Sequence, residues 1–283
     1  MPRTLPFLLP ALAIGLWAPP APAAESYDNC TGTIAALPAA TSTQGTWCLK
    51  GDLGTDITTG AAITVATNNV TIDCNGFKLG GLAAGDGTEA TGIHAPNRRN
   101  VTVRNCNIRG FFRGVHLTGE AGGGHQVEDN MFDGNTFAGI DVQGDGSVVQ
   151  RNRVRDTGGS TQTPIASGIR VTGTIDVLGN SVAGVFASDS SDAHGILTIA
   201  NAGGSINGNR VSMVLANPGT AYGIYNPFNG RMSMRDNDLS GPDTGIGVSC
   251  TSDAAILRDN TLLGFATGND GCTNGGGNVF HAP

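Results

Sequence analysis

The fold of this 283-residue chain is decided by a short phrase that recurs along it, as in Val127-Glu-Asp-Asn130-Met-Phe132, Val149-Gln-Arg-Asn152-Arg-Val154 and Ile206-Asn-Gly-Asn209-Arg-Val211. Each copy has an apolar residue, two further residues, a residue that is usually Asn, one more residue and a second apolar residue. Eight copies occur, from Ile72-x-x-Asn75-x-Phe77 onward, and their central residues lie 22 to 31 positions apart at Asn75, Cys106, Asn130, Asn152, Asn180, Asn209, Asn237 and Asn260. A repeat of this period is the signature of a solenoid. Because the apolar spacing is not that of a helix, each unit is expected to be two short strands joined at a polar corner.

A second phrase, Gly followed by a β-branched residue, lies between the copies of the first. It occurs at Gly92-Ile93, Gly114-Val115, Gly139-Ile140, Gly168-Ile169, Gly195-Ile196, Gly223-Ile224 and Gly245-Ile246. Each coil is therefore expected to hold three short strands, whose side chains alternate between core and solvent. Stacked coils share one aliphatic core. The corner Asn side chains are expected to form a ladder of amide hydrogen bonds.

On these repeats the chain resembles the right-handed parallel β-helix family, which includes pectate lyases and polygalacturonases. The segment Asn69-Val-Thr-Ile-Asp-Cys-Asn-Gly-Phe-Lys-Leu-Gly-Gly81 is similar to the first coil of carbohydrate-binding and sugar-hydrolase-type β-helix repeats. The resemblance covers residues 46–280 and implies an all-β, right-handed parallel β-helix of about eight coils with an Asn ladder. It does not imply one reaction, because this scaffold carries many chemistries.

The catalytic motifs of the familiar β-helix enzymes are missing from the sequence. The chain has neither the Asn-Thr-Asp and Asp-Asp motifs of polygalacturonases nor the Arg-x-Pro-x-x-Arg phrase of pectate lyases. It also lacks the Asp-Pro-His-Glu of β-helix epimerases. Their catalytic residues therefore cannot be transferred to this chain.

Residues 1–24 have the pattern of a secretory signal: Arg3, an apolar stretch from Leu5 to Trp17, and the small-residue site Ala21-Pro22-Ala23. No other stretch approaches the ~18 apolar residues of a transmembrane segment. We therefore expect a protein that is secreted or periplasmic.

The remaining residues, 25–283, are expected to form a single β-helix domain with an N-terminal cap over about residues 25–60. We expect a monomer, although the final strand near Gly275–Pro283 leaves end-to-end association open. The formal net charge of −7 argues against nucleic acid as a partner, because nucleic-acid binding needs a basic surface.

The six cysteines are an even number, as expected for disulfides in an oxidising compartment. We expect Cys30 to pair with Cys48 in the cap, Cys74 with Cys106 between neighbouring coils, and Cys250 with Cys272 in the last turns. The alternative is free buried thiols. Zinc is not expected, because there is no Cys-x-x-Cys pair.

Candidate functional residues lie on the outward positions of the Gly-Ile strands, where enzymes of this fold bind their substrates. The expected column is His94, His116, Asp141, Arg170, Leu197, Tyr225, Gly247, and Asn269 or Asp270. Its first four members would form one polar strip, although outward positions of a β-helix are normally solvated and inert.

The lengths of the segments that enter these strands indicate a groove at the same place. Residues 80–91, 156–167 and 185–194 are long, whereas residues 109–113 and 133–138 are short. Short loops between long ones predict a notch centred on His116 and Asp141, and a concavity with convergent polar groups is the default binding site.

A second candidate is the loop Asp189-Ser-Ser-Asp192-Ala-His194, which could bind substrate or hold a cation such as calcium. No calcium motif supports a cofactor, and an exposed polar turn has the same composition. Arg113, at the mouth of the notch, could pair with a sugar carboxylate.

Together these features predict a protein that binds an extracellular polysaccharide and could depolymerise it as a lyase or hydrolase. In a uronate lyase, Arg170 or His116 would abstract a proton, Asp141 would orient His116, and Arg113 would offset the substrate charge. His94, Tyr225, Asp189, Asp192 and His194 would bind substrate. The alternative is a non-catalytic scaffold or adhesin, in which the rod itself is the functional product.

Overall fold

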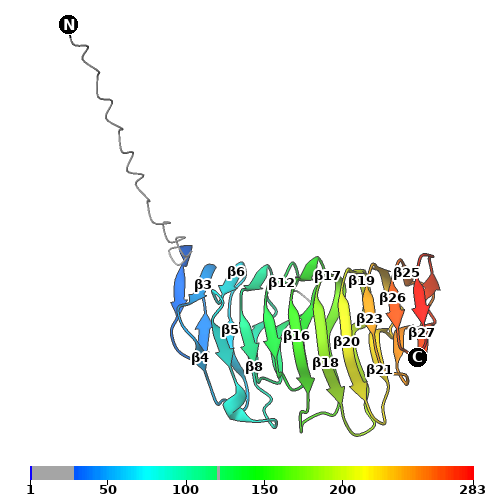
Figure 1. Cartoon of the computed structure of the whole chain (residues 1–283). Coiled ribbons are helices and arrows are strands. Elements are labelled where there is room, and N and C mark those ends of the chain that lie inside the picture. The colour runs from blue at the N-terminus through cyan, green and yellow to red at the C-terminus, as the bar shows by residue number, and fades with distance from the viewer. Residues whose placement is uncertain (2–28, 120–121) are drawn as a thin grey trace.

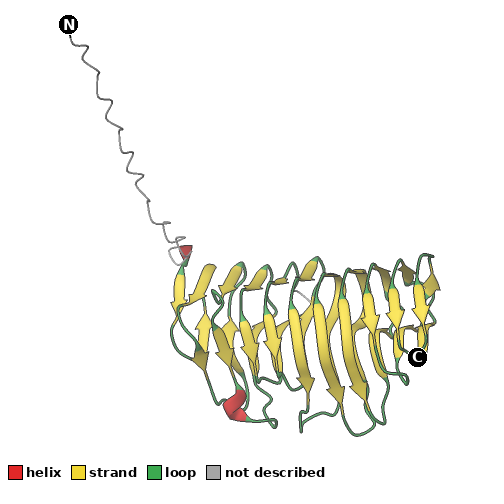
Figure 2. Ribbon diagram, viewed as in Figure 1, coloured by secondary structure: helices red, strands yellow, loops and turns green. Residues whose placement is uncertain are grey.

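The computed structural model describes residues 1, 29–119 and 122–283, which build a rod of stacked β-coils (Figures 1 and 2). Residues 2–24 of the expected secretory signal lie outside the described residues. Strands make up nearly all of the regular structure of the described residues, and a short 3₁₀ turn, η2 (Leu82–Ala84), precedes β8 (Thr91–Pro96). Among the described residues, no helix is long and apolar enough to cross a membrane.

Each coil contributes one strand to each of three faces, here called the Gly-Ile face, the pre-corner face and the post-corner face. The Gly-Ile face contains β2 (Ala39–Thr41), β5 (Ala61–Val65), β8 (Thr91–Pro96), β11 (Arg113–Thr118), β14 (Ala138–Gln143), the first parts of β17 (Ala166–Leu178) and β19 (Ala193–Asn207), β21 (Ala221–Asn226), β24 (Ile246–Cys250) and β27 (Thr267–Asp270). The pre-corner face contains β1 (Gly32–Ile34), β3 (Gly45–Leu49), β6 (Val70–Asp73), β9 (Val101–Arg104), β12 (Gln126–Glu128), β15 (Ser147–Gln150), the last parts of β17 and β19, β22 (Arg231–Arg235), β25 (Ile256–Arg258) and β28 (Thr273–Asn274).

The post-corner face is a separate sheet of ten strands among the described residues. It contains β4 (Leu53–Gly54), β7 (Lys78–Gly80), β10 (Asn107–Arg109), β13 (Met131–Asp133), β16 (Arg153–Gly158), β18 (Ser181–Ala187), β20 (Arg210–Ala216), β23 (Asp238–Ser240), β26 (Thr261–Leu263) and β29 (Val279–His281). The eight strands from β7 to β26 belong to the eight repeats of the sequence. β4 and β29 extend the stack by one strand at each end, and all pairings are parallel.

The core is the aliphatic column predicted from the alternation. Ile140, for example, pairs with Val115 in the coil before it and with Ile169 in the coil after it. All three side chains are fully buried. Stacking therefore buries a continuous apolar column that no single coil could bury alone.

The glycine of each Gly-Ile phrase is required because its backbone touches the next coil. A Cβ on Gly114 would lie 2.5 Å from the carbonyl oxygen of Gly139 and 2.6 Å from Cδ1 of Phe132. The same contact identifies Gly247, whose Cβ would lie 2.7 Å from the oxygen of Gly268. The assignment of Gly245 to this column was wrong by two residues, because Gly245-Ile246-Gly247-Val248 contains the phrase twice.

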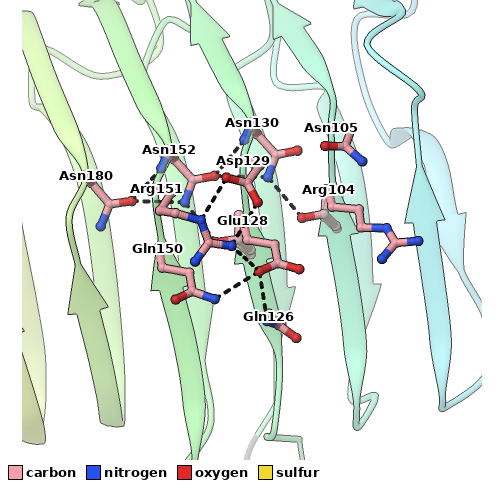
Figure 3. Close-up of polar contacts among 12 residues, drawn as sticks. Arg104, Asn105, Gln126, Glu128, Asp129, Asn130, Gln150, Arg151, Asn152 and Asn180 are labelled. Atoms are coloured by element: carbon pink, nitrogen blue, oxygen red, sulfur yellow. Dashed lines mark hydrogen bonds and ion pairs between the residues drawn. The ribbon is translucent and has the colours of Figure 1, made fainter. Parts of the chain in front are cut away.

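The Asn ladder runs along the corner between the pre-corner and post-corner faces (Figure 3). Asn130 Nδ2 donates to Asn152 Oδ1 at 3.0 Å, and Asn152 Nδ2 donates to Asn180 Oδ1 at 3.0 Å. Each Oδ1 also accepts the backbone N–H of the preceding corner residue, as Asn180 Oδ1 does from Asn152 at 2.9 Å. The ladder continues to Asn278, in the segment expected to fray. It satisfies polar groups that each tight corner would otherwise bury unpaired.

The first copy of the repeat has a different register from the one predicted. Asn75 is not in the ladder: it adopts φ 51° and donates to the carbonyl of Leu49 at 3.0 Å. The preceding residue, Cys74, is disulfide-bonded to the corner residue Cys106. This corner is longer, so Leu79 rather than Phe77 takes the inward place opposite Ile108.

All three predicted disulfides are present, and none of the described cysteines is free. Cys30–Cys48 fastens the first strands, Cys74–Cys106 joins two coils, and Cys250–Cys272 joins the last ones. Within the segment expected to be a cap, β2, β3 and β4 pair in parallel with β5, β6 and β7.

Candidate functional site

Strand pairing places the predicted polar residues in one column on the outside of the Gly-Ile face. The column runs Thr64, His94, His116, Asp141, Arg170, Leu197, Tyr225, Ser249 and Asp270. From His94 to Tyr225 this is the predicted order. The next member was predicted wrongly: Ser249 replaces Gly247, because of the two-residue shift at Gly247. Asp270, one of the two alternatives given for the last member, follows Ser249.

Asp141 is the centre of a cluster of cationic and imidazole groups. Its Oδ2 accepts a hydrogen bond from Arg113 Nε at 3.2 Å and lies 3.7 Å from His116 Nε2 and 3.8 Å from Arg170 Nε. Asp141 is only 2% exposed. The expectation of a solvated outward residue therefore fails here, because these neighbouring side chains cover the carboxylate.

Two phenylalanines form a shelf under the arginines. Phe112 and Phe137 stack with their ring centroids 4.7 Å apart. The guanidinium carbons of Arg113 and Arg170 lie 4.8 and 4.6 Å from the Phe137 centroid. Cation–π contact with one buried ring fixes both guanidinium groups and adds to their attraction to Asp141.

Burial keeps the histidines of the cluster neutral. Desolvation lowers the pKa of His116 to about 4, although the negative charge of Asp141 opposes the shift. Burial and the charge of Arg113 also lower the pKa of His94. The two imidazoles stack with centroids 5.1 Å apart. At neutral pH the cluster therefore carries two guanidinium charges against one carboxylate, and its neutral imidazoles can accept a proton.

An aromatic group continues the face beyond Arg170. The ring of His194 is nearly parallel to those of Tyr225 and Tyr222, with centroids 5.3 and 5.6 Å away. The two tyrosine rings are 4.3 Å apart. His194 is buried, and its Nδ1 lies 3.2 Å from Ser167 Oγ. Burial lowers the pKa of His194 to about 4.

A hollow of about 410 Å³ opens beside these rings. Its walls are Ile165, Ser190, Ser191, Asp192, His194, Leu197, Tyr225, Pro227 and Phe228. Asp192 accepts the backbone N–H of Thr220 at 2.9 Å, whereas Asp189 lies exposed in the same loop. Within the described part of the chain, no group of three or more His, Cys, Asp and Glu side chains could hold a metal ion.

The notch differs from the predicted one because its two walls touch each other. The backbone N–H of Thr161 donates to the carbonyl of Asp86 at 3.3 Å, and Gln162 Nε2 donates to that of Gly87 at 3.1 Å. Loops three coils apart thus meet across the short turns that carry Phe112 and Phe137. The bridge closes the loop side, so the site is a strip along the strands.

Several residues of this surface were missed in the sequence: Phe112, Phe137, Ser167, Tyr222 and Phe228. Ser167, His194 and Tyr222 each stand immediately before the glycine of the Gly-Ile phrase in their coil, as Arg113 does. Strand pairing links Ser167 to His194 and His194 to Tyr222. Position relative to the glycine was the signal that could have revealed this second column.

A larger hollow, about 700 Å³, lies outside the Asn corner around Asn105, Asp129, Met131 and Arg151. Its Arg151 is already paired with Asp129 and with Glu128, both at 2.8 Å (Figure 3). Because two carboxylates already hold the guanidinium group of Arg151 on an exposed surface, Arg151 offers an anionic ligand less than the arginines of the Asp141 cluster do.

Comparison with protein-family models matches residues 62–262 to the right-handed β-helix region. This chain belongs to the right-handed β-helix family. The family assignment establishes the handedness that strand pairing alone left unstated. No curated protein matches the sequence.

Solved structures with a similar fold include a mutant tailspike protein of E. coli bacteriophage HK620 in complex with a pentasaccharide. It is 10% identical with a TM-score of 0.53, and the alignment covers 88% of this β-helix but 58% of the tailspike chain. An alginate lyase from Paenibacillus sp. is 11% identical with a TM-score of 0.46, covering 90% and 99% of the two chains. A mannuronan C-5 epimerase module from Azotobacter vinelandii is 16% identical with a TM-score of 0.38, covering 89% and 88%. At such identities the likeness extends to the fold alone.

Proposed function

We propose that this β-helix binds an acidic polysaccharide along its Gly-Ile face, with a sugar carboxylate held by Arg113 and Arg170. The observation that carries the proposal is the buried Asp141 carboxylate, which holds two guanidinium groups on one outward strip. At 3.8 Å, Arg170 Nε is too far from Asp141 for a hydrogen bond, so its donors are not consumed by that contact. Arginine is suited to bidentate recognition of carboxylates.

The charge of the site also favours an anionic ligand. The protein as a whole has a net charge of −7, yet the cluster has an excess of positive charge when its histidines are neutral. A half-buried guanidinium group attracts an anion more strongly than an exposed one, because less water screens it. The polymer would thus be drawn to this strip and away from the acidic remainder of the surface.

The cluster suits β-elimination better than hydrolysis. Glycoside hydrolysis ordinarily uses two carboxylates that flank the scissile bond. Asp141 is the one carboxylate of the cluster, and it is buried beneath its cationic partners. In an elimination, Arg113 and Arg170 would stabilise the negative charge that develops on the uronate, and neutral His116 would accept the proton next to the carboxylate. The electron pair left behind would form the C4=C5 double bond as the glycosidic C4–O bond breaks, and the departing oxygen would take a proton from solvent water. The negative charge of Asp141, whose Oδ2 lies 3.7 Å from His116 Nε2, would orient the imidazole by electrostatic attraction rather than by a hydrogen bond.

Export remains part of the proposal. The three disulfides favour an oxidising compartment outside the cytoplasm, which is also where the proposed polysaccharide ligand would be met. A secreted or periplasmic protein would therefore meet its ligand without reduction of these bonds.

Binding to a panel of acidic and neutral polysaccharides tests this function, followed by an ultraviolet assay for unsaturated uronate products. We expect acidic polymers to bind and Arg170→Gln to weaken binding about tenfold or more, as for loss of a charge-assisted hydrogen bond. The control is Arg210→Gln, which changes an exposed ion pair with Asp238 on the post-corner face. Failure of every acidic polymer to bind would overturn the proposal and favour the non-catalytic scaffold. An equal effect of the control would overturn the placement of the site.

A further inference from the structure

The binding face has two chemically different ends. At one end lie the guanidinium groups of Arg113 and Arg170. At the other lie the aromatic rings of Tyr222 and Tyr225 and the hollow beside them. Leu197, between Arg170 and Tyr225 in the column, is 9% exposed and forms an apolar floor. The strip therefore changes from cationic to aromatic along its length.

We propose that the ligand is a mixed polysaccharide, in which an acidic sugar binds at the arginines and a neutral sugar stacks at the tyrosines. This inference rests on the proposed function and assigns the second part of its site. It excludes a polymer made only of uronic acids as the preferred ligand.

The aromatic end has the composition of a neutral-sugar site. A pyranose ring has an apolar face of C–H groups, which pack against aromatic rings, and an equatorial edge of hydroxyl groups. Tyr225, Phe228 and Pro227 supply the apolar wall of the hollow, and Ser190, Ser191 and Asp192 supply polar groups. Phe228 is 51% exposed. Because Phe228 is exposed and lies in the wall of the hollow, its side chain provides apolar contact area for a pyranose ring.

Asp192 distinguishes the two ends electrostatically. Its carboxylate can accept hydrogen bonds from sugar hydroxyls, but it would repel a second carboxylate. Its charge acts on the surrounding rings, since it raises the pKa of Tyr222 in addition to the effect of burial. An acidic sugar is therefore favoured at the arginines and disfavoured beside Asp192.

The separation of the ends matches a short oligosaccharide. Arg170 and Tyr225 occupy the same column two coils apart, with Leu197 between them. Two coils correspond to about 10 Å, from a strand spacing of about 4.8 Å. Two neighbouring pyranose rings in an extended polysaccharide cover a comparable length.

The test compares three polymers by calorimetric titration: polygalacturonate as the acidic homopolymer, a neutral β-glucan, and hyaluronan as an alternating polymer of a uronic acid and a neutral N-acetylhexosamine. We expect the mixed polymer to bind about tenfold more tightly than polygalacturonate. We expect Tyr225→Ala to weaken binding of the mixed polymer by about 2- to 10-fold, without altering the weaker binding of polygalacturonate. Phe186→Ala is the control, because Phe186 is an exposed aromatic residue on β18 of the post-corner face.

The outcomes separate this inference from the proposed function. If polygalacturonate binds as tightly as the mixed polymer and Tyr225→Ala changes neither affinity, the mixed-ligand inference is wrong and the proposed function stands. If no acidic polymer binds, both fail. If Phe186→Ala weakens binding as much as Tyr225→Ala does, the aromatic end is not where the ring stacks.

Discussion

Replacing Asn180 by Ala should destabilise the β-helix measurably, because this side chain makes four hydrogen bonds inside the corner. Its Nδ2 donates to the carbonyl of Val149 at 2.9 Å and to Asn209 Oδ1 at 3.0 Å. Its Oδ1 accepts from the backbone N–H of Asn152 at 2.9 Å and from Asn152 Nδ2 at 3.0 Å. The substitution leaves that buried N–H without an acceptor and removes one bond from each of the other partners.

The magnitude follows from these losses. An orphaned buried donor costs about 1–3 kcal/mol, and partners that keep another bond lose less. We expect the free energy of unfolding to fall by about 3 kcal/mol. For a domain of this size, this corresponds to a decrease of roughly 6–12 °C in melting temperature.

Thermal unfolding followed by circular dichroism measures this change. The control is Asn107→Ala on β10, a half-buried outward position expected to change stability by less than about 0.5 kcal/mol. A loss at Asn180 no larger than the loss at Asn107 would refute the argument that the ladder stabilises the corners.

The remaining predictions concern the buried charge, the coil-joining disulfide and acid sensitivity. Asp141→Ala should lower the free energy of unfolding by about 3 kcal/mol, because it leaves partly buried cations without their counter-charge; an unchanged urea midpoint would contradict this. Replacing Cys74 and Cys106 by Ser should cost roughly 4 kcal/mol, since the disulfide closes a sequence separation of 32 residues, and denaturant titration of the double variant measures the loss. Burial lowers the pKa of His125 to about 4, so the unfolded chain binds its proton first and stability should fall between about pH 6.5 and 4, by on the order of 3 kcal/mol for this one side chain. Burial lowers the pKa of His116 and His194 to about 4 as well, so His125→Gln should reduce the pH dependence of the melting temperature in that range without abolishing it. An unaltered slope would contradict the contribution of His125.

The parts of the molecule set by strict periodicity could be predicted from the sequence. Alternation and the glycine phrase were enough to align His116, Asp141 and Arg170 correctly, because strand pairing admits few registers when one face is buried. Periodicity failed where the local sequence was ambiguous: Gly245 and Gly247 both fit the phrase, and the first corner contains two extra residues around Asn75.

The surroundings of the site could not be predicted, because they depend on contacts between coils distant in sequence. The outward position of Asp141 gave no sign that Arg113, His116 and Arg170 would bury it. The bridge between residues 80–91 and 156–167 joins loops 75 positions apart at Gly87 and Gln162. Neither contact leaves a local pattern in the sequence. The depth and shape of the Gly-Ile face could therefore be seen only in the structure.

A crystal structure of the protein with a short uronic-acid-containing oligosaccharide tests the central claim most directly. We predict that a sugar carboxylate lies within hydrogen-bonding distance of the guanidinium groups of Arg113 and Arg170, with the chain running along the Gly-Ile face. An oligosaccharide bound in the trough at the Asn corner, with its carboxylates contacting neither arginine, would contradict the account.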